Sequence, residues 1–269
     1  MPGKKGGAKR AGRDHDRSSS NPLGLISVAD VITGLAAFSG IMAIYMFFRY
    51  WGDITLGTAF IIISIILDGM DGAAARRWGT KHNYGHILDS IADSISFCIA
   101  PGVLVFVVYY NGDIASYQGG LSVAAACLVT VLGITRLIRY STEGYKHSNF
   151  SGLPSPAQAF TLCLVAHIVT ADTWNVAIPL VLIAAYSMVT PVPYPKLKGK
   201  PAIAFVLVLV IATSYIIAYR ALTNQVDREV FDSLSTFGLL AVYTYIIGGP
   251  VFQTVQDRIA RGTEGAARG

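Results

Sequence analysis

Apolar residues along this chain gather into runs whose length suits a helix that crosses a membrane. A hydrocarbon core about 30 Å thick is spanned by roughly 20 helical residues. The fifth and sixth runs are short and are separated only by residues 171–174, so the sequence leaves open whether they form one span or two. Counted separately, the runs predict about eight transmembrane helices, at residues 30–48, 54–75, 88–110, 121–140, 155–171, 175–190, 202–219 and 233–252.

The composition also favours a helical membrane protein. The chain of 269 residues is 53% hydrophobic and 14% charged, whereas about a quarter of the residues in an average soluble domain are charged. We therefore expect an all-α fold, a polytopic integral membrane helical bundle. The expected organisation is a disordered basic tail at residues 1–20, one membrane domain at residues 21–257 and a flexible tail at residues 258–269.

The basic residues predict how the bundle is oriented. With eight spans and a cytoplasmic N-terminus, 18 of the 21 Lys and Arg residues fall in cytoplasmic segments. This asymmetry is the one that the positive-inside rule describes, so both termini are expected in the cytoplasm. The net charge of +5 then reflects topology and contact with anionic lipid headgroups, and it calls for no nucleic acid partner.

Four aspartates stand out because they lie at the ends of apolar runs. Asp68 and Asp71 are three residues apart, and Asp89 and Asp93 are four residues apart, so each pair occupies one face of a helix. Two such helices joined by a short loop would bring all four carboxylates together. Crowded carboxylates in apolar surroundings need protons or cations to offset their charge, and all-oxygen ligand sets suit Mg²⁺ or Mn²⁺. Small residues share these faces: Gly72, Ala75 and Gly85.

Two other interpretations of the acids remain open at this stage. Charged residues near the end of a span are often solvated interfacial groups, and intramembrane acids also mark the ion paths of cation or proton transporters. Transporter sites tend to lie near the middle of the membrane in repeated, broken helices, whereas these acids lie at one edge and no repeat is visible. Asp30, at the start of the first span, is interpreted as an interfacial cap and not as a fifth metal ligand.

The same residues resemble the signature of a known family. The pattern DxxDGxxAR, followed after eight residues by GxxxDxxxD, is similar to that of the CDP-alcohol phosphotransferases. Four further segments resemble the serine-transferring branch, the phosphatidylserine and archaetidylserine synthases, and the likeness covers roughly residues 25–200. These segments are DSIADSISFCIAPGVLVF, GITRLIRY, FSGLPSPAQAF and VPYPKLKGK.

The resemblance implies a metal-dependent enzyme of the cytoplasmic membrane with its active site facing the cytosol. It would transfer the phospholipid group of CDP-archaeol or CDP-diacylglycerol to the hydroxyl of L-serine, releasing CMP, and would act as a homodimer. The rival acceptors within the family are glycerol 3-phosphate and an inositol phosphate. The roles that the resemblance implies are two Mg²⁺ or Mn²⁺ ions on Asp68, Asp71, Asp89 and Asp93, catalysis by Asp89 and Asp93 with Asp93 as the base, and nucleotide contacts from Gly72, Ala75, Arg76 and Gly85.

An acceptor such as serine needs a partner for its carboxylate. Arg136 and Arg139, at the cytosolic end of the fourth span, are the best candidates because a guanidinium offers paired donors. The alternative is that both arginines anchor the span at the membrane interface. Lys196 and Lys198 are weaker candidates, since a short basic loop is also the ordinary topology signal.

Overall fold

The computed structural model describes residues 27–78, 85–143, 150–191 and 193–194, together with residues 236, 239–240, 243–244, 246–248 and 254. The tails predicted at residues 1–20 and 258–269 lie outside this part of the chain. The described elements are α1 (Val28–Arg49), α2 (Thr55–Trp78), α3 (Gly85–Asp93), the π-helix η2 (Ser94–Ile99), α4 (Ala100–Tyr109), α5 (Tyr117–Glu143), β1 (Phe150–Ser151), α6 (Ser155–Ile168), the 3₁₀-helix η3 (Ala171–Thr173), α7 (Trp174–Val189) and β2 (Pro193–Tyr194).

The helical bundle expected from the apolar runs is present in the described residues. Five helical segments are long and apolar enough to cross a membrane, and α6 is a shorter apolar helix of 14 residues. The fifth and sixth predicted spans are separate, because α6 ends at Ile168 and α7 begins at Trp174. The only departure from an all-helical fold in this part is the two-residue ladder between β1 and β2. The predicted span at 202–219 and most of 233–252 lie outside the described residues, so the count of eight stays a prediction.

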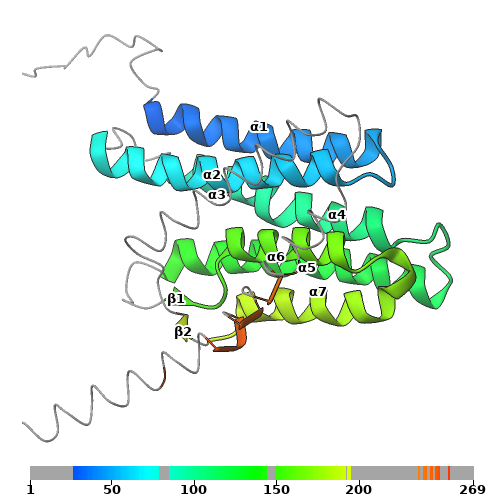
Figure 1. Cartoon of the computed structure of the whole chain (residues 1–269). Coiled ribbons are helices and arrows are strands. Elements are labelled where there is room, and N and C mark those ends of the chain that lie inside the picture. The colour runs from blue at the N-terminus through cyan, green and yellow to red at the C-terminus, as the bar shows by residue number, and fades with distance from the viewer. Residues whose placement is uncertain are drawn as a thin grey trace, which may run out of the picture.

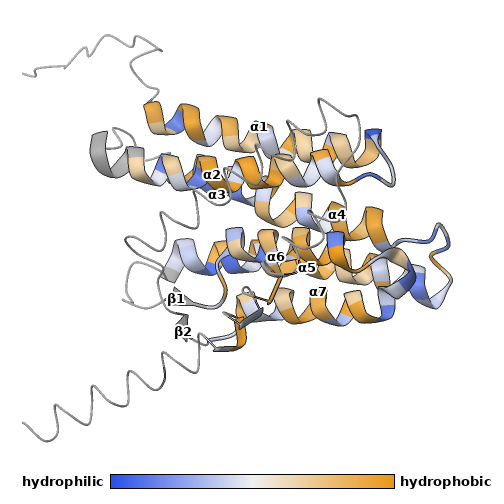
Figure 2. Ribbon diagram, in the orientation of Figure 1, coloured by the Kyte–Doolittle hydropathy of each residue, from blue (hydrophilic) through white to orange (hydrophobic). Residues whose placement is uncertain are grey.

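Successive helical segments run in alternating directions, with α3, η2 and α4 forming one continuous segment, so the connections alternate between two ends of the bundle. The N-terminal end of α1, the C-terminal ends of α2 and α5, and both strands lie at one end, at the left of Figure 1. The loop at 110–116 and the turn before α7 lie at the other end. Apolar residues dominate the length of the helices, as Figure 2 shows. Most polar side chains therefore lie toward the two ends of the bundle.

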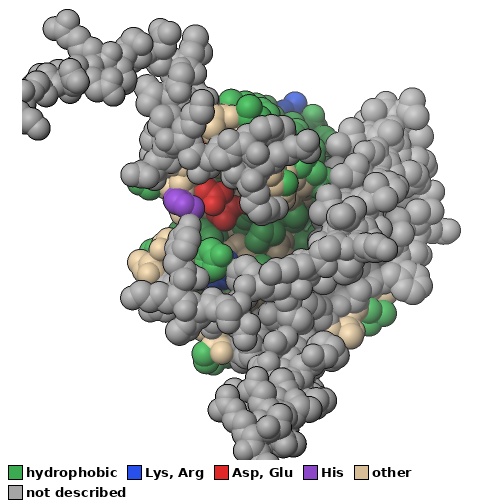
Figure 3. All heavy atoms as spheres, turned by 90° about the vertical axis from the view of Figure 1, so that its left-hand side faces the viewer, with side chains coloured by type: hydrophobic (Ala, Val, Ile, Leu, Met, Phe, Trp, Pro, Cys, Tyr) green, Lys and Arg blue, Asp and Glu red, His purple; other side chains and the backbone are tan. Residues whose placement is uncertain are grey.

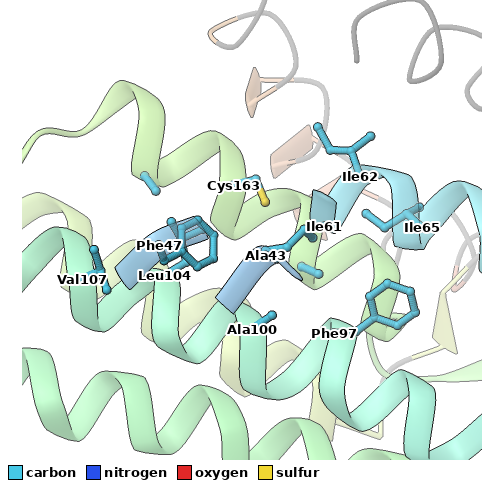
Figure 4. Packing of buried hydrophobic residues seen from close by; sticks show 12 residues of the cluster. Ala43, Phe47, Ile61, Ile62, Ile65, Phe97, Ala100, Leu104, Val107 and Cys163 are labelled. Carbon is cyan, nitrogen blue, oxygen red and sulfur yellow. The ribbon is translucent and has the colours of Figure 1, made fainter. Parts of the chain in front are cut away.

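Two apolar clusters hold the helices together, with α4 and α6 contributing to both. Phe47, Ile61 and Leu104 centre the first cluster, which joins α1, α2, η2, α4 and α6 (Figure 4). The second joins α4, α5, α6 and α7 around Val129 and Val181. Small residues such as Ala43 and Ala100 let the helices approach closely in the first cluster, as small residues do in membrane bundles.

Candidate active site

The structure gathers the predicted aspartates where α2 and α3 meet. Carboxylate oxygens of Asp68, Asp71 and Asp89 lie within 4.8 Å of one another, an arrangement that can hold a metal ion. Asp93 is outside this close group, but its carboxylate interacts electrostatically with those of the other three aspartates. Acidic side chains line a hollow at the end of the bundle that carries β1 and β2 (Figure 3). An all-oxygen donor set of this kind suits hard divalent cations, whose charge would offset the mutual repulsion of the carboxylates.

Helix α1 is the template that brings the two pairs of acids together. The carbonyl oxygen of Ala36 accepts a hydrogen bond from Ser64 on α2, at 2.9 Å, and another from Ser96 on η2, at 3.0 Å. Gly40, one turn further on, permits this approach, since a Cβ atom there would lie 2.5 Å from the Ser96 hydroxyl oxygen. One point on α1 therefore fixes both acid-bearing segments.

Asp71 is oriented directly by α1. Its Oδ2 accepts a 2.6 Å hydrogen bond from the hydroxyl of Thr33, and both side chains are buried. The Thr33 oxygen also lies 3.0 Å from the Ala29 carbonyl, so its position is fixed from both sides. A hydroxyl that holds a metal ligand in one rotamer is the usual outer support of a metal site.

We expect Thr33→Val to weaken the use of the divalent cation, because it removes the support of Asp71 at nearly constant volume. Loss of such a supporting contact typically costs roughly 10- to 100-fold in metal affinity or activity. The dependence of turnover on Mn²⁺ concentration measures the effect. Thr135→Val is the matched control, since the Thr135 hydroxyl is exposed and, among the described residues, bonds only the Val131 carbonyl of its own helix. Identical Mn²⁺ curves for both variants would show that Thr33 plays no such part.

The polypeptide departs from regular α-helix immediately after Asp93. Residues 94–99 form the π-helix η2, and α4 continues the same span from Ala100. Such π-helical segments are rare in proteins, and those that occur are often found at functional sites. Here the segment directs Ser96 toward α1 and brings Cys98 against Gly133 of α5. The π-helix that directly follows Asp93 therefore contacts both α1 and α5.

The predicted nucleotide-contacting residues lie on the same two helices. Gly72 follows Asp71 directly in α2, and Gly85 is the first residue of α3, one turn before Asp89. Both glycines are partly exposed. The side chains of Ala75 and Arg76 lie outside the described residues, so their roles stay predictions.

The two predicted acceptor arginines have different surroundings. Arg136 is 9% exposed, donates a 2.7 Å hydrogen bond from Nη1 to Ser155 at the start of α6, and interacts electrostatically with Asp93. Arg139 is exposed and donates to the carbonyl of Val189 at the end of α7. Arg136 therefore faces the acidic cluster. The hydrogen bond from Arg139 to Val189 instead links α5 to α7. The acceptor role of Arg139 stays a prediction.

The short ladder joins two segments singled out in the sequence. Phe150 pairs with Tyr194, and Ser151 with Pro193, so the segment before α6 lies beside the segment that leads to the predicted basic loop. Gly152 makes the turn from β1 into α6 possible, because its φ of +84° is unfavourable for other residues. Lys196 and Lys198 lie outside the described residues.

Residues 26–192 match the family model described as CDP-alcohol phosphatidyltransferase. The chain belongs to the CDP-alcohol phosphatidyltransferase family.

Relatives in this family carry related names. A CDP-diacylglycerol–serine O-phosphatidyltransferase of Methanocaldococcus jannaschii is 31% identical over 176 residues, covering 65% of this chain and 77% of the relative. One of Helicobacter pylori, with the same name, is 29% identical over 236 residues, covering 84% and 92%. An archaetidylserine synthase of Methanothermobacter thermautotrophicus is 26% identical over 180 residues, covering 66% and 73%.

The family match spans α1 to α7 and includes the four aspartates and Arg136. It weakens the transporter interpretation, because the acids belong to the family domain and lie at one end of the bundle. Asp30 forms a capping box with Ser27 at the start of α1, as the sequence predicted. Thr33, Ser64 and Ser96 were not singled out in the sequence, since hydroxyl residues inside an apolar run carry no pattern that marks their distant partners.

Proposed function

We propose that this protein transfers the phospholipid group of CDP-archaeol or CDP-diacylglycerol to the hydroxyl of L-serine and releases CMP. The observation that carries the proposal is the buried Arg136, which interacts electrostatically with Asp93 beside the acidic cluster. A metal-binding cluster alone fits any acceptor in the family. Among the side chains that the structure describes, Arg136 is the one buried guanidinium next to it, which fits an acceptor with one carboxylate, and the names of the relatives agree.

All four aspartates of the cluster would hold metal ions, and Asp93 would also act as the base. Asp68, Asp71 and Asp89, together with Asp93, would hold two divalent cations, Mg²⁺ or Mn²⁺. When bound, such ions neutralise the diphosphate and stabilise the departing phosphate oxygen. Gly72, Ala75 and Gly85, which have little or no side chain, would allow the CDP group to approach the backbone of the two helices, and Arg76 would support that region or offset the charge of the CDP group.

Asp93 is the proposed general base. The serine oxygen forms a bond to the lipid-side phosphorus, the bond from that phosphorus to the oxygen of CMP breaks, and the serine hydroxyl proton passes to Asp93. Asp89, one turn before Asp93, would help to position it. Arg136 would hold the serine carboxylate so that its hydroxyl points toward the lipid-side phosphorus.

The proposed location is the cytoplasmic membrane, with the acidic cluster facing the cytosol. The segments that precede α1, follow α2, follow α5 and follow α7 all meet the end of the bundle that carries the cluster. These segments, together with the C-terminal parts of α2 and α5, contain most of the basic residues of the chain, which the positive-inside rule assigns to the cytosolic side. The homodimer implied by the family resemblance stays a prediction.

The function is tested by incubating the purified protein in detergent with a CDP-lipid, Mn²⁺ or Mg²⁺, and one labelled acceptor at a time. We expect CMP release and labelled lipid with L-serine, and neither with glycerol 3-phosphate or inositol phosphate. If a phosphorylated acceptor gave product and serine gave none, serine would be the wrong acceptor, but the transfer of the phospholipid group from the CDP-lipid would stand. Metal or proton flux in sealed vesicles, without a nucleotide product, would revive the transporter interpretation.

A further inference from the structure

A buried polar group with unused hydrogen-bonding capacity lies between α5 and α6. Its members are Arg136, Ser155 and Gln158, of which Ser155 and Gln158 are fully buried. Ser155 accepts a hydrogen bond from Arg136, but the Arg136 Nε has no partner among the described residues. Neither the Nε2 nor the Oε1 of Gln158 has a partner there. Gln158 is not among the residues predicted from the sequence.

These unpaired atoms call for an explanation. A polar atom that is buried without a partner is costly, and native proteins leave few of them unless a ligand, ion or water completes the bonding. Gln158 follows Ser155 by three residues, so the two side chains are neighbours on one side of α6. The unused atoms of Arg136 and Gln158 therefore belong to one buried polar cluster around Ser155. Through Arg136, this cluster adjoins Asp93.

The unused donors and acceptors of this cluster select a class of ligand. The unused guanidinium N–H can only donate, which suits a carboxylate. The carbonyl oxygen of Gln158 can only accept, which suits an ammonium group. An α-amino acid carries both groups on one carbon atom, whereas a phosphorylated alcohol carries no donor of comparable strength. The cluster therefore fits a zwitterion.

We infer that Gln158 is a specificity-determining residue that accepts a hydrogen bond from the ammonium group of the amino-acid acceptor while Arg136 binds its carboxylate. The inference rests on the proposed function and deepens it, since it says how the site distinguishes serine from other hydroxyl compounds. A site that hydrogen-bonds a substrate group rejects analogues without that group, because its own polar atoms are then left unpaired.

The test is the variant Gln158→Met, which keeps the length of the side chain and removes both polar atoms. We expect the KM for L-serine to rise at least about tenfold, because a hydrogen bond to a charged group is lost. The KM for the CDP-lipid and the Mn²⁺ dependence should stay as in the wild type. The inhibition constant of 3-hydroxypropanoate, which has the carboxylate and hydroxyl of serine but no ammonium group, should differ less than twofold between the variant and the wild type. Gln158→Asn, a smaller change, should give an intermediate KM for serine.

Thr161→Val is the matched control. Thr161 is equally buried on α6, but its hydroxyl already bonds the Ala157 carbonyl, so serine use should not change. An unchanged serine KM in Gln158→Met, or equal losses for serine and 3-hydroxypropanoate, overturns the role of Gln158 and leaves the proposed function intact. A wild-type protein that does not use serine at all overturns both.

Discussion

Asp93→Asn is expected to abolish turnover while CDP-lipid binding persists. The substitution preserves the size of the side chain and removes the carboxylate that would accept the serine proton. General acid–base catalysis typically contributes roughly 10²- to 10⁴-fold to the rate, so the loss in CMP release should fall in that range or above it. Asp93 is outside the close group formed by Asp68, Asp71 and Asp89, so that group retains its carboxylates for metal and diphosphate.

Two measurements separate a base from a binding residue in this experiment. The initial rate of CMP release at saturating serine gives the loss in kcat, and equilibrium binding of a labelled CDP-lipid in Mn²⁺ gives the affinity. We expect a large change in the first and less than tenfold in the second. Asp113→Asn, in the loop at the opposite end of the bundle, controls for the loss of a charge and should leave both unchanged. Wild-type turnover in Asp93→Asn would exclude Asp93 as the base.

The part of the site that the sequence predicted is the part encoded by local periodicity. Asp68 and Asp71, like Asp89 and Asp93, share a face because of their spacing along one helix, and the structure places them accordingly. The cap at Asp30 is local in the same sense, whereas the sequence left open the separation of α6 from α7. Residues three or four apart on a helix lie on the same face, so their spacing in a single sequence is enough to predict that they are neighbours.

The supports of the site could not be predicted because they join residues far apart in the chain. Thr33 and Asp71 are separated by 38 residues, and Ser96 lies 60 residues from the Ala36 carbonyl that it bonds. No spacing rule relates such pairs. The π-helix after Asp93 also lacks a sequence signal, since its residues are ordinary for an apolar helix. Burial distinguishes Arg136 from Arg139, and burial depends on how α5 packs against α6 and α7.

Asp71→Asn is the second change expected to have a large effect, and it acts through metal binding. Asp71 has the least solvent-exposed side chain of the four aspartates and is held by Thr33, so it is a well-oriented candidate ligand. The amide removes one negative charge from the cluster and still accepts the Thr33 hydrogen bond. Bound metals supply several kcal/mol of transition-state stabilisation, so we expect turnover to fall by on the order of 10²-fold or more.

Metal binding can be measured for Asp71→Asn without any turnover. A ligand that binds only the folded state stabilises it by about 2.7 kcal/mol at a concentration of 100 times its Kd, so Mn²⁺ should raise the Tm of the wild-type protein. The rise should be much smaller in Asp71→Asn. Asp30→Asn is the matched control, since it makes the same substitution at the same end of the bundle in a carboxylate that caps α1. Asp30→Asn should keep both the Mn²⁺-dependent rise and the turnover. A full Mn²⁺-dependent rise in Asp71→Asn would remove Asp71 from the set of metal ligands, because the cluster would then bind the ion equally well with one carboxylate fewer.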